Sequence, residues 1–116
     1  MKILLVDLYS NSIESCNWFT NVKTTIEKVI QECSRVSPDT FNLRICDLET
    51  VQEYVYDPNL GYYSKESLNK FNMTDIIVIS GECSYLPFLV RVRPIRILFN
   101  MAKWTNKHMF CIGMGF

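Results

Sequence analysis

The sequence predicts a three-layer α/β sandwich built on a parallel sheet of about four strands. Short apolar runs, which suit strands, alternate along the chain with longer amphipathic stretches, which suit helices. The runs at residues 3–6 and 76–79 are apolar without interruption, as is typical of parallel strands that are buried on both faces. We therefore expect one domain over residues 1–116, with right-handed crossovers between successive strands.

Residues 2–8 form the first predicted strand, which ends in a polar turn. Ser12 is suited to cap the helix after this turn, because its hydroxyl can accept a hydrogen bond from a backbone N–H group of the first helical turn. From Ile13 onward, apolar side chains recur at helical spacing as far as Cys33, which predicts an amphipathic helix of about five turns. Cys16 and Cys33 lie on its apolar face, so we expect both in the core.

Residues 41–48 alternate between apolar and polar side chains, which predicts a strand near the edge of the sheet. Residues 49–63 are acidic and rich in tyrosine, and Pro58 and Gly61 interrupt them. This composition predicts a loop with a short helical turn. A short helix is predicted to follow at residues 64–73.

The apolar run at residues 76–79 is the clearest buried strand of the chain. Residues 88–104 predict a helix, most firmly after Pro94, because proline is favoured in the first turn. His108–Ile112 is the fourth predicted strand, and His108 is interpreted as a polar residue at its start. Little sequence follows this strand, so we expect its outer surface to be covered by further polypeptide or by another chain.

The charge balance and the cysteines argue against several classes of protein. Lys and Arg total 12 and Asp and Glu total 12, and a net charge of zero argues against a simple nucleic-acid binder. No apolar run approaches the ~20 residues of a membrane-spanning helix, so membrane insertion is not expected. The 5 cysteines contain no Cys-x-x-Cys pair, which favours free thiols over disulfides or a zinc site. We therefore expect an intracellular, reducing compartment, cytoplasmic by default, with no metal and no cofactor.

Three segments at the predicted carboxyl ends of strands resemble class I glutamine amidotransferases. Residues 6–12 resemble the family's opening strand and its Asp-x-Tyr-x-Ser turn. Ser80, Gly81 and Glu82 are similar to the start of the Ser-Gly-Gly-Pro-Gly-x-Pro loop, which in that family helps to form the oxyanion hole. Residues 111–115, Cys-Ile-Gly-Met-Gly, resemble the nucleophile elbow Gly-Ile-Cys-x-Gly. The resemblance implies a flavodoxin-like fold that corresponds to the N-terminal part of such a domain and is truncated at its C-terminus.

In the preferred alignment, the same resemblance leaves the nucleophile position of the elbow without a reactive side chain. With residues 110–112 as the strand end, Gly113 occupies the nucleophile position and has no side chain to attack with. A shift of two residues makes Cys111 the nucleophile but shortens the strand. We prefer the first alignment, in which Cys111 is a small core residue. Glu82 stands where the family has glycine, and a carboxylate there opposes the stabilisation of an oxyanion. The family's base follows the elbow, whereas His108 precedes it.

These departures favour a non-catalytic amidotransferase-like domain that acts as a structural or interaction subunit of a larger assembly. The alternative is a part of an active glutamine amidotransferase, with Cys111 as the nucleophile and the His–Glu pair supplied beyond Phe116 or by another chain. A second alternative is an FMN-binding flavodoxin-like protein. It would hold the flavin phosphate at the turn of residues 9–12, although that turn has no glycine.

One segment of the chain, residues 91–107, is basic and contains no acidic residue, whereas acidic residues gather at 47–57. Such segregation suits docking to a charged partner surface, either an acidic protein or, despite the net charge, a nucleic acid. A solvated helix face is the ordinary interpretation of the same pattern. The docking interpretation and the solvated-face interpretation both stay open. The candidate docking residues are Arg91, Arg93, Arg96, Lys103, Trp104 and Lys107.

Overall fold

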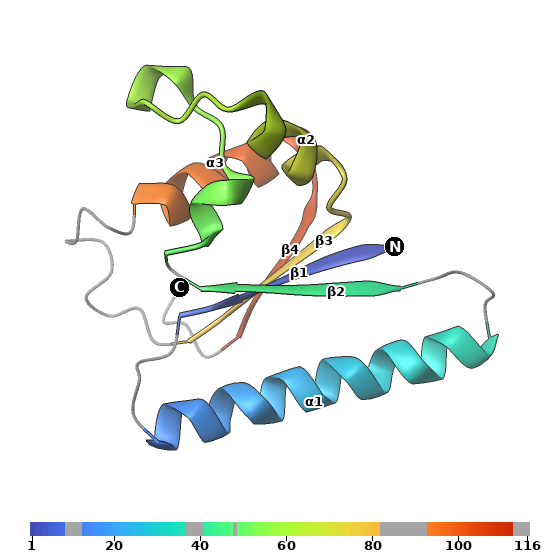
Figure 1. The fold of residues 1–116 in the computed structure, drawn as a ribbon. Helices are drawn as coiled ribbons and strands as arrows, with labels where there is room; N and C mark the ends of the chain where they lie inside the picture. The colour runs from blue at the N-terminus through green and yellow to red at the C-terminus, as the bar shows by residue number, and fades with distance from the viewer. Residues whose placement is uncertain (9–12, 37–40, 48, 82–92, 113–116) are drawn as a thin grey trace.

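A four-stranded parallel sheet forms the centre of the protein (Figure 1). The computed structural model describes residues 1–8, 13–36, 41–47, 49–81 and 93–112. The strands are β1 (Lys2–Asp7), β2 (Asn42–Asp47), β3 (Ile76–Ser80) and β4 (His108–Ile112). They lie in the order β2-β1-β3-β4, with every neighbouring pair parallel. This is the strand order of flavodoxin-like folds, and the predicted fold class is confirmed.

Helices cover both faces of the sheet and complete the three layers (Figure 1). One face carries the long helix α1 (Ile13–Val36). The other face carries α2 (Lys65–Asn72), α3 (Arg93–Thr105) and the 3-10 turn η1 (Val51–Tyr54). A second 3-10 turn, η2 (Pro58–Leu60), lies between η1 and α2 in the chain.

The predicted elements are found, with small differences at their ends. Helix α1 continues three residues past its predicted end at Cys33, and β3 includes Ser80. The predicted loop between β2 and α2 holds two 3-10 turns instead of one. Strand β4 has the predicted bounds, and β2 lies at an edge of the sheet as predicted. Ser12 and residues 88–92 lie outside the described residues, so the predicted cap and the predicted start of α3 stay predictions.

Alternation along the strands divides the core in two. Leu4 and Val6 of β1 face α2 and α3, in a cluster that contains Phe71 and Leu98, both almost completely buried. Ile3 and Leu5 face α1, whose sheet-facing side chains are only partly buried. Those side chains follow the expected helical spacing: Phe19, Val22, Ile26 and Ile30.

Two cysteines that the sequence places in the core are exposed. Cys33 follows the apolar spacing of α1, but Ile30 is the last described side chain of this helix that packs against the sheet. Cys111 is exposed because β4 is an edge strand of the sheet. The side chain of Cys16 lies outside the described part of the chain. Cys46, on β2, is buried.

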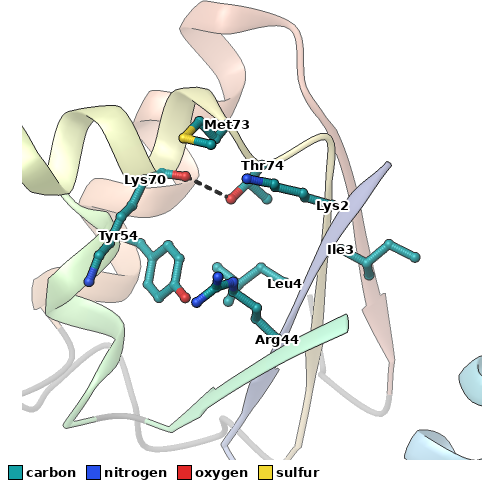
Figure 2. A pocket seen from close by; sticks show the side chains of 8 residues that line it. All are labelled: Lys2, Ile3, Leu4, Arg44, Tyr54, Lys70, Met73 and Thr74. Carbon is teal, nitrogen blue, oxygen red and sulfur yellow. Dashed lines mark hydrogen bonds between the residues drawn. The ribbon is translucent and has the colours of Figure 1, made fainter. Parts of the chain in front are cut away.

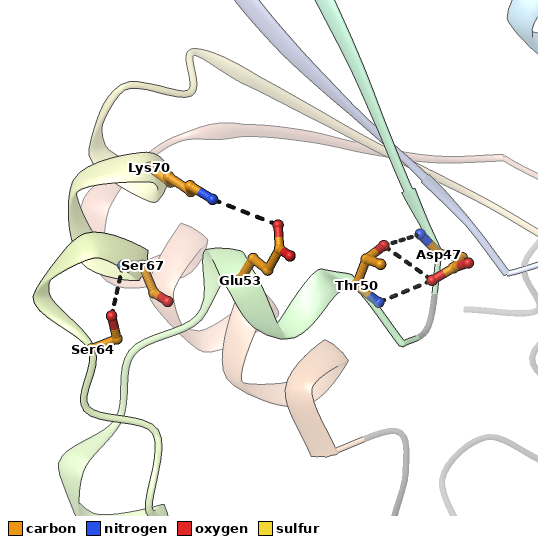
Figure 3. Close-up of polar contacts among 6 residues, drawn as sticks. All are labelled: Asp47, Thr50, Glu53, Ser64, Ser67 and Lys70. Carbon is orange, nitrogen blue, oxygen red and sulfur yellow. Dashed lines mark hydrogen bonds and ion pairs between the residues drawn. The ribbon is translucent and has the colours of Figure 1, made fainter.

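Hydrogen bonds join the end of β2 to the residue before η1, and an ion pair joins η1 to α2 (Figure 3). Asp47 Oδ1 accepts hydrogen bonds from the Thr50 N–H at 2.9 Å and the Thr50 hydroxyl at 3.0 Å. In return, the Asp47 N–H donates to Thr50 Oγ1 at 2.9 Å. The hydrogen bond from the Thr50 backbone lowers the pKa of Asp47, because it stabilises the carboxylate. Lys70 of α2 pairs with Glu53 of η1 at 3.6 Å, so the two elements are also linked to each other.

The turn from α3 to β4 ends the helix and holds the neighbouring helix α2. Asn106 has a φ of 56°, and the Lys107 N–H donates to the Ala102 carbonyl at 3.1 Å, which together form a Schellman-type helix end. Asparagine tolerates this left-handed conformation better than most residues. The Lys107 ammonium donates to the Thr74 carbonyl at 2.6 Å and to the Asn72 carbonyl at 3.4 Å, at the end of α2. This lysine therefore connects the two helices.

Candidate functional site

The carboxyl ends of the strands form one row, which is where ligands bind in open parallel sheets. The register aligns Asp47 with Asp7, Asp7 with Ser80, and Ser80 with Ile112. Ser80 is completely buried, and its hydroxyl donates to the Val6 carbonyl at 3.4 Å. The Gly81 N–H donates to the Ile112 carbonyl at 3.2 Å, and Gly81 has a φ of 140°, which side-chain-bearing residues rarely adopt. Both residues thus tie β1, β3 and β4 together at this edge.

Other residues of the predicted amidotransferase-like site lie outside the described residues. These are Glu82 of the oxyanion-loop segment and Gly113 of the elbow. Their proposed roles stay predictions.

Cys111 is a regular residue of β4. It is paired in register with Ile79, and the strand continues through Ile112. A nucleophile elbow instead holds its nucleophile on a strained turn between a strand and a helix. His108 is the first residue of the same five-residue strand, so it lies about 13 Å from the carboxyl edge. A base at that distance cannot contact a nucleophile at the carboxyl edge.

Cys46 is a second thiol near the carboxyl edge, and the sequence does not single it out. Burial raises its pKa to about 12, and the carboxylates of Asp47, Glu53 and Asp7 act in the same direction. Both causes disfavour the thiolate, which is the nucleophilic form. Cys46 is therefore a buried thiol that strongly favours its protonated form.

The outer face of α3 brings together four of the predicted docking residues. Arg93, Arg96 and Lys103 are exposed and follow helical spacing, and Trp104 is 85% exposed beside them. We call these four residues the basic stripe. Lys107 lies apart from the stripe, because its ammonium binds the carbonyls at the end of α2. Arg91 lies outside the described residues.

A groove of about 360 Å³ lies next to the basic stripe, between α2 and α3. The Met101 sulfur accepts a hydrogen bond from the Tyr56 N–H at 3.2 Å, which holds the chain before η2 against α3. Most of the groove's side chains are apolar or aromatic, and Asp57 is its one acidic side chain among the described residues. The apolar and aromatic lining includes Tyr56, Leu68, Phe71, Ile97, Met101 and Trp104.

Helical geometry places the groove and the cations on opposite flanks of α3. Successive residues are rotated by about 100° around a helix. Ile97 and Met101 therefore lie on the flank that faces the groove, and Arg96 and Lys103 lie on the other flank. Trp104 lies between the two flanks. This arrangement can hold an apolar side chain and an acidic side chain of one ligand at the same time. The sequence predicted the cations and Trp104, but the groove depends on the packing of α2 against α3.

The fold and this site define the class of the protein as a flavodoxin-like α/β domain with an exposed basic helix face. Comparison of the chain with protein-family models, with curated proteins and with solved structures finds no match. The resemblance to amidotransferases therefore depends on the sequence motifs alone. Among the described residues, no group of three or more His, Cys, Asp or Glu side chains is arranged to hold a metal ion. No helix in the described ranges is long and apolar enough to cross a membrane.

Proposed function

We propose that this chain is a non-catalytic, amidotransferase-like domain that acts as an interaction subunit. Its basic stripe and the adjacent groove bind an acidic, amphipathic segment of a protein partner. The observation that carries this proposal is the position of Trp104, which is 85% exposed between an apolar groove and a line of cations.

The non-catalytic part of the proposal is supported by the site where a nucleophile is expected. In the preferred alignment this position is Gly113, which has no reactive side chain. Cys111 lies within β4, and His108 lies at the opposite end of that strand. Nucleophilic catalysis by a thiol needs a base within hydrogen-bond distance, and these positions do not supply one.

The docking part is supported by the two flanks of α3. An amphipathic helix commonly binds by placing its apolar side chains in a groove between two helices. Leu68, Phe71 and Met101 supply the apolar lining here, while Arg96 and Lys103 lie where they would face acidic side chains of the ligand. Exposed tryptophan and arginine are the residues that most often dominate binding energy at protein interfaces. Complementary charge adds association rate and selectivity.

A protein ligand fits this surface better than a nucleic acid does. The groove is mainly apolar and includes the Asp57 carboxylate, which would repel phosphate groups.

The test is a binding assay with two matched fluorescent peptides. Each peptide carries leucines at helical spacing, and the other positions are glutamate in one peptide and lysine in the second. Fluorescence anisotropy should show saturable binding of the glutamate peptide, weakened by added salt, and much weaker binding of the lysine peptide. Trp104→Ala should raise the Kd by about tenfold or more. The double variant Arg93→Glu/Lys103→Glu should raise it by a similar factor.

Lys28→Glu is the matched control, because Lys28 is exposed on α1 and lies on the other face of the sheet. It should leave the Kd unchanged. Equal binding of the two peptides, or equal effects of the control and the α3 variants, would contradict the docking proposal. Tighter binding of a DNA duplex than of the glutamate peptide would contradict it as well. Release of ammonia from glutamine by the purified chain would contradict the non-catalytic assignment.

A further inference from the structure

A second pocket lies near the amino ends of β1 and β2, at the end of the sheet opposite to the carboxyl edge (Figure 2). Its volume is about 120 Å³, well above the roughly 10–15 Å³ that a cavity needs to hold one water molecule. Its lining includes Lys2, Leu4, Arg44, Tyr54 and Lys70. This pocket shares no residue with the groove beside α3, so a ligand bound here would be independent of the proposed docking function.

The strand register places two cations of this pocket on the core-facing side of the sheet. Lys2 and Leu4 point to the same face of β1 because side chains alternate along a strand. Arg44 of β2 is the register partner of Leu4, so it points to that face as well. This face packs against η1 and α2. Lys2 is half-buried and Arg44 is exposed, so both charged groups lie at the solvent-accessible rim of this face and not inside its apolar core.

The acidic groups near the pocket already have other partners. Glu53 pairs with Lys70 at 3.6 Å. Asp75 Oδ2 accepts a hydrogen bond from the main-chain N–H of Lys2 at 2.7 Å. Within the described part of the chain, neither the Lys2 ammonium nor the Arg44 guanidinium has an ion-pair partner. The pocket thus keeps two positive charges that no acidic side chain of the described ranges neutralises.

Tyr54 supplies a third group that favours an anion. The residue is only 7% exposed, and its ring lies between Lys70 and Arg44 with the hydroxyl on the Arg44 side (Figure 2). This hydroxyl makes no hydrogen bond to another described residue. Buried tyrosine hydroxyls normally have a partner. Among the described residues, every fully buried side-chain polar atom has a hydrogen-bond partner. Because the Tyr54 hydroxyl has none, it is not fully buried, and it faces the pocket that Tyr54 lines.

We propose that this pocket binds a phosphoryl group, either as inorganic phosphate or as the terminal group of a phosphomonoester. The Arg44 guanidinium can donate two parallel hydrogen bonds to phosphate oxygens. The Lys2 ammonium supplies a second positive charge, which suits a dianion, and the Tyr54 hydroxyl donates to a remaining oxygen. The volume is sufficient for a phosphoryl group.

The test is isothermal titration calorimetry of the whole chain with sodium phosphate at constant ionic strength. Constant ionic strength separates site binding from general screening. We expect saturable binding of one phosphate per chain, with no comparable binding of acetate or chloride. Arg44→Gln should weaken binding by about tenfold or more, because it removes charge-assisted hydrogen bonds. Tyr54→Phe should weaken it by several-fold, and Lys28→Gln on the far face should not change it.

The same titration with O-phosphoserine distinguishes the two sources of the group. Tighter binding of O-phosphoserine identifies a phosphomonoester ligand, and tighter binding of inorganic phosphate identifies the free ion. Lys2→Gln provides a second charge-removing variant at the very start of β1, in case Arg44→Gln does not fold. Absence of saturable heat with both ligands would overturn the proposal. Equal binding of acetate, or equal affinities of Arg44→Gln, Lys2→Gln and Lys28→Gln, would overturn it too.

Discussion

Cys46 shows how burial and neighbouring carboxylates together keep a thiol in its protonated form. It is buried on β2 beside the carboxyl edge, with Asp47, Glu53 and Asp7 near it. Burial and these carboxylates act in the same direction and raise its pKa to about 12. At neutral pH the thiol therefore stays protonated.

We expect Cys46 to resist alkylation in the folded protein. At pH 8 its thiolate fraction is far below that of an ordinary thiol, so iodoacetamide should modify it at least about a hundredfold more slowly than the exposed Cys33. Peptide mass spectrometry over a time course measures both rates. In denaturant, where burial is lost, the two rates should become similar. Equal rates in the native protein would contradict the environment described for Cys46.

Among the elements, α2 depends on contacts made by the turn that follows α3. Helix α2 has only eight residues, and short helices owe most of their stability to tertiary contacts. Its N-terminal cap is weak, because the Ser64 hydroxyl accepts from the Ser67 N–H at 3.4 Å. At its other end, the Lys107 ammonium binds two carbonyls and lies 5.0 Å from the centre of the Phe71 ring. Positive charge at a helix C-terminus is favourable.

Lys107→Met should therefore lower the free energy of unfolding by about 1–2 kcal/mol, because it leaves these carbonyls without a charged donor. Lys103→Met is the matched control, since Lys103 is exposed on α3 and its replacement should change stability by less than about 0.5 kcal/mol. Urea unfolding followed by circular dichroism measures both values. If the two variants lost the same stability, Lys107 would not have the structural role assigned to it.

The whole molecule is unequally packed on the two faces of its sheet. Under α2 and α3, residues such as Leu98 and Ile79 are completely buried. On the α1 face, the strand register places Phe110 and Ile112 of β4 beside Val78 and Ser80. Phe110 is 56% exposed and Ile112 is 40% exposed, so α1 covers this face only in part. The larger cluster of buried residues therefore lies on the side of α2 and α3.

This asymmetry predicts different costs for two truncations of apolar side chains. Leu98→Ala should lower the free energy of unfolding by about 2–5 kcal/mol, because it opens a cavity among completely buried neighbours. Phe110→Ala should cost less than about 1 kcal/mol, since more than half of this side chain already contacts solvent. Equilibrium unfolding in urea at low protein concentration compares them. A loss at Phe110 as large as that at Leu98 would show that this face is covered in solution.

The secondary structure and its order were readable from the sequence because they depend on local periodicity. The apolar run at residues 76–79 and the helical spacing from Ile13 to Ile30 predict β3 and α1 directly. The prediction for Cys33 is wrong because periodicity gives the side of a helix but not where its partner surface ends. The prediction for Cys111 is wrong because the exposure of this residue depends on the position of β4 at the edge of the sheet.

The candidate sites also depend in part on local sequence and in part on tertiary structure. Local sequence is enough to define the alternating α/β order, the positively charged residues of α3 and the place of Trp104 among them, because these follow from residue type and helical spacing. Only the tertiary structure joined Leu68 of α2 to Met101 of α3 in one groove, and brought Lys2, Arg44 and Tyr54 around one pocket. The residues of each site come from separate elements. Their meeting is decided by the order and register of the strands and by the packing of helices on the sheet, which no local pattern encodes.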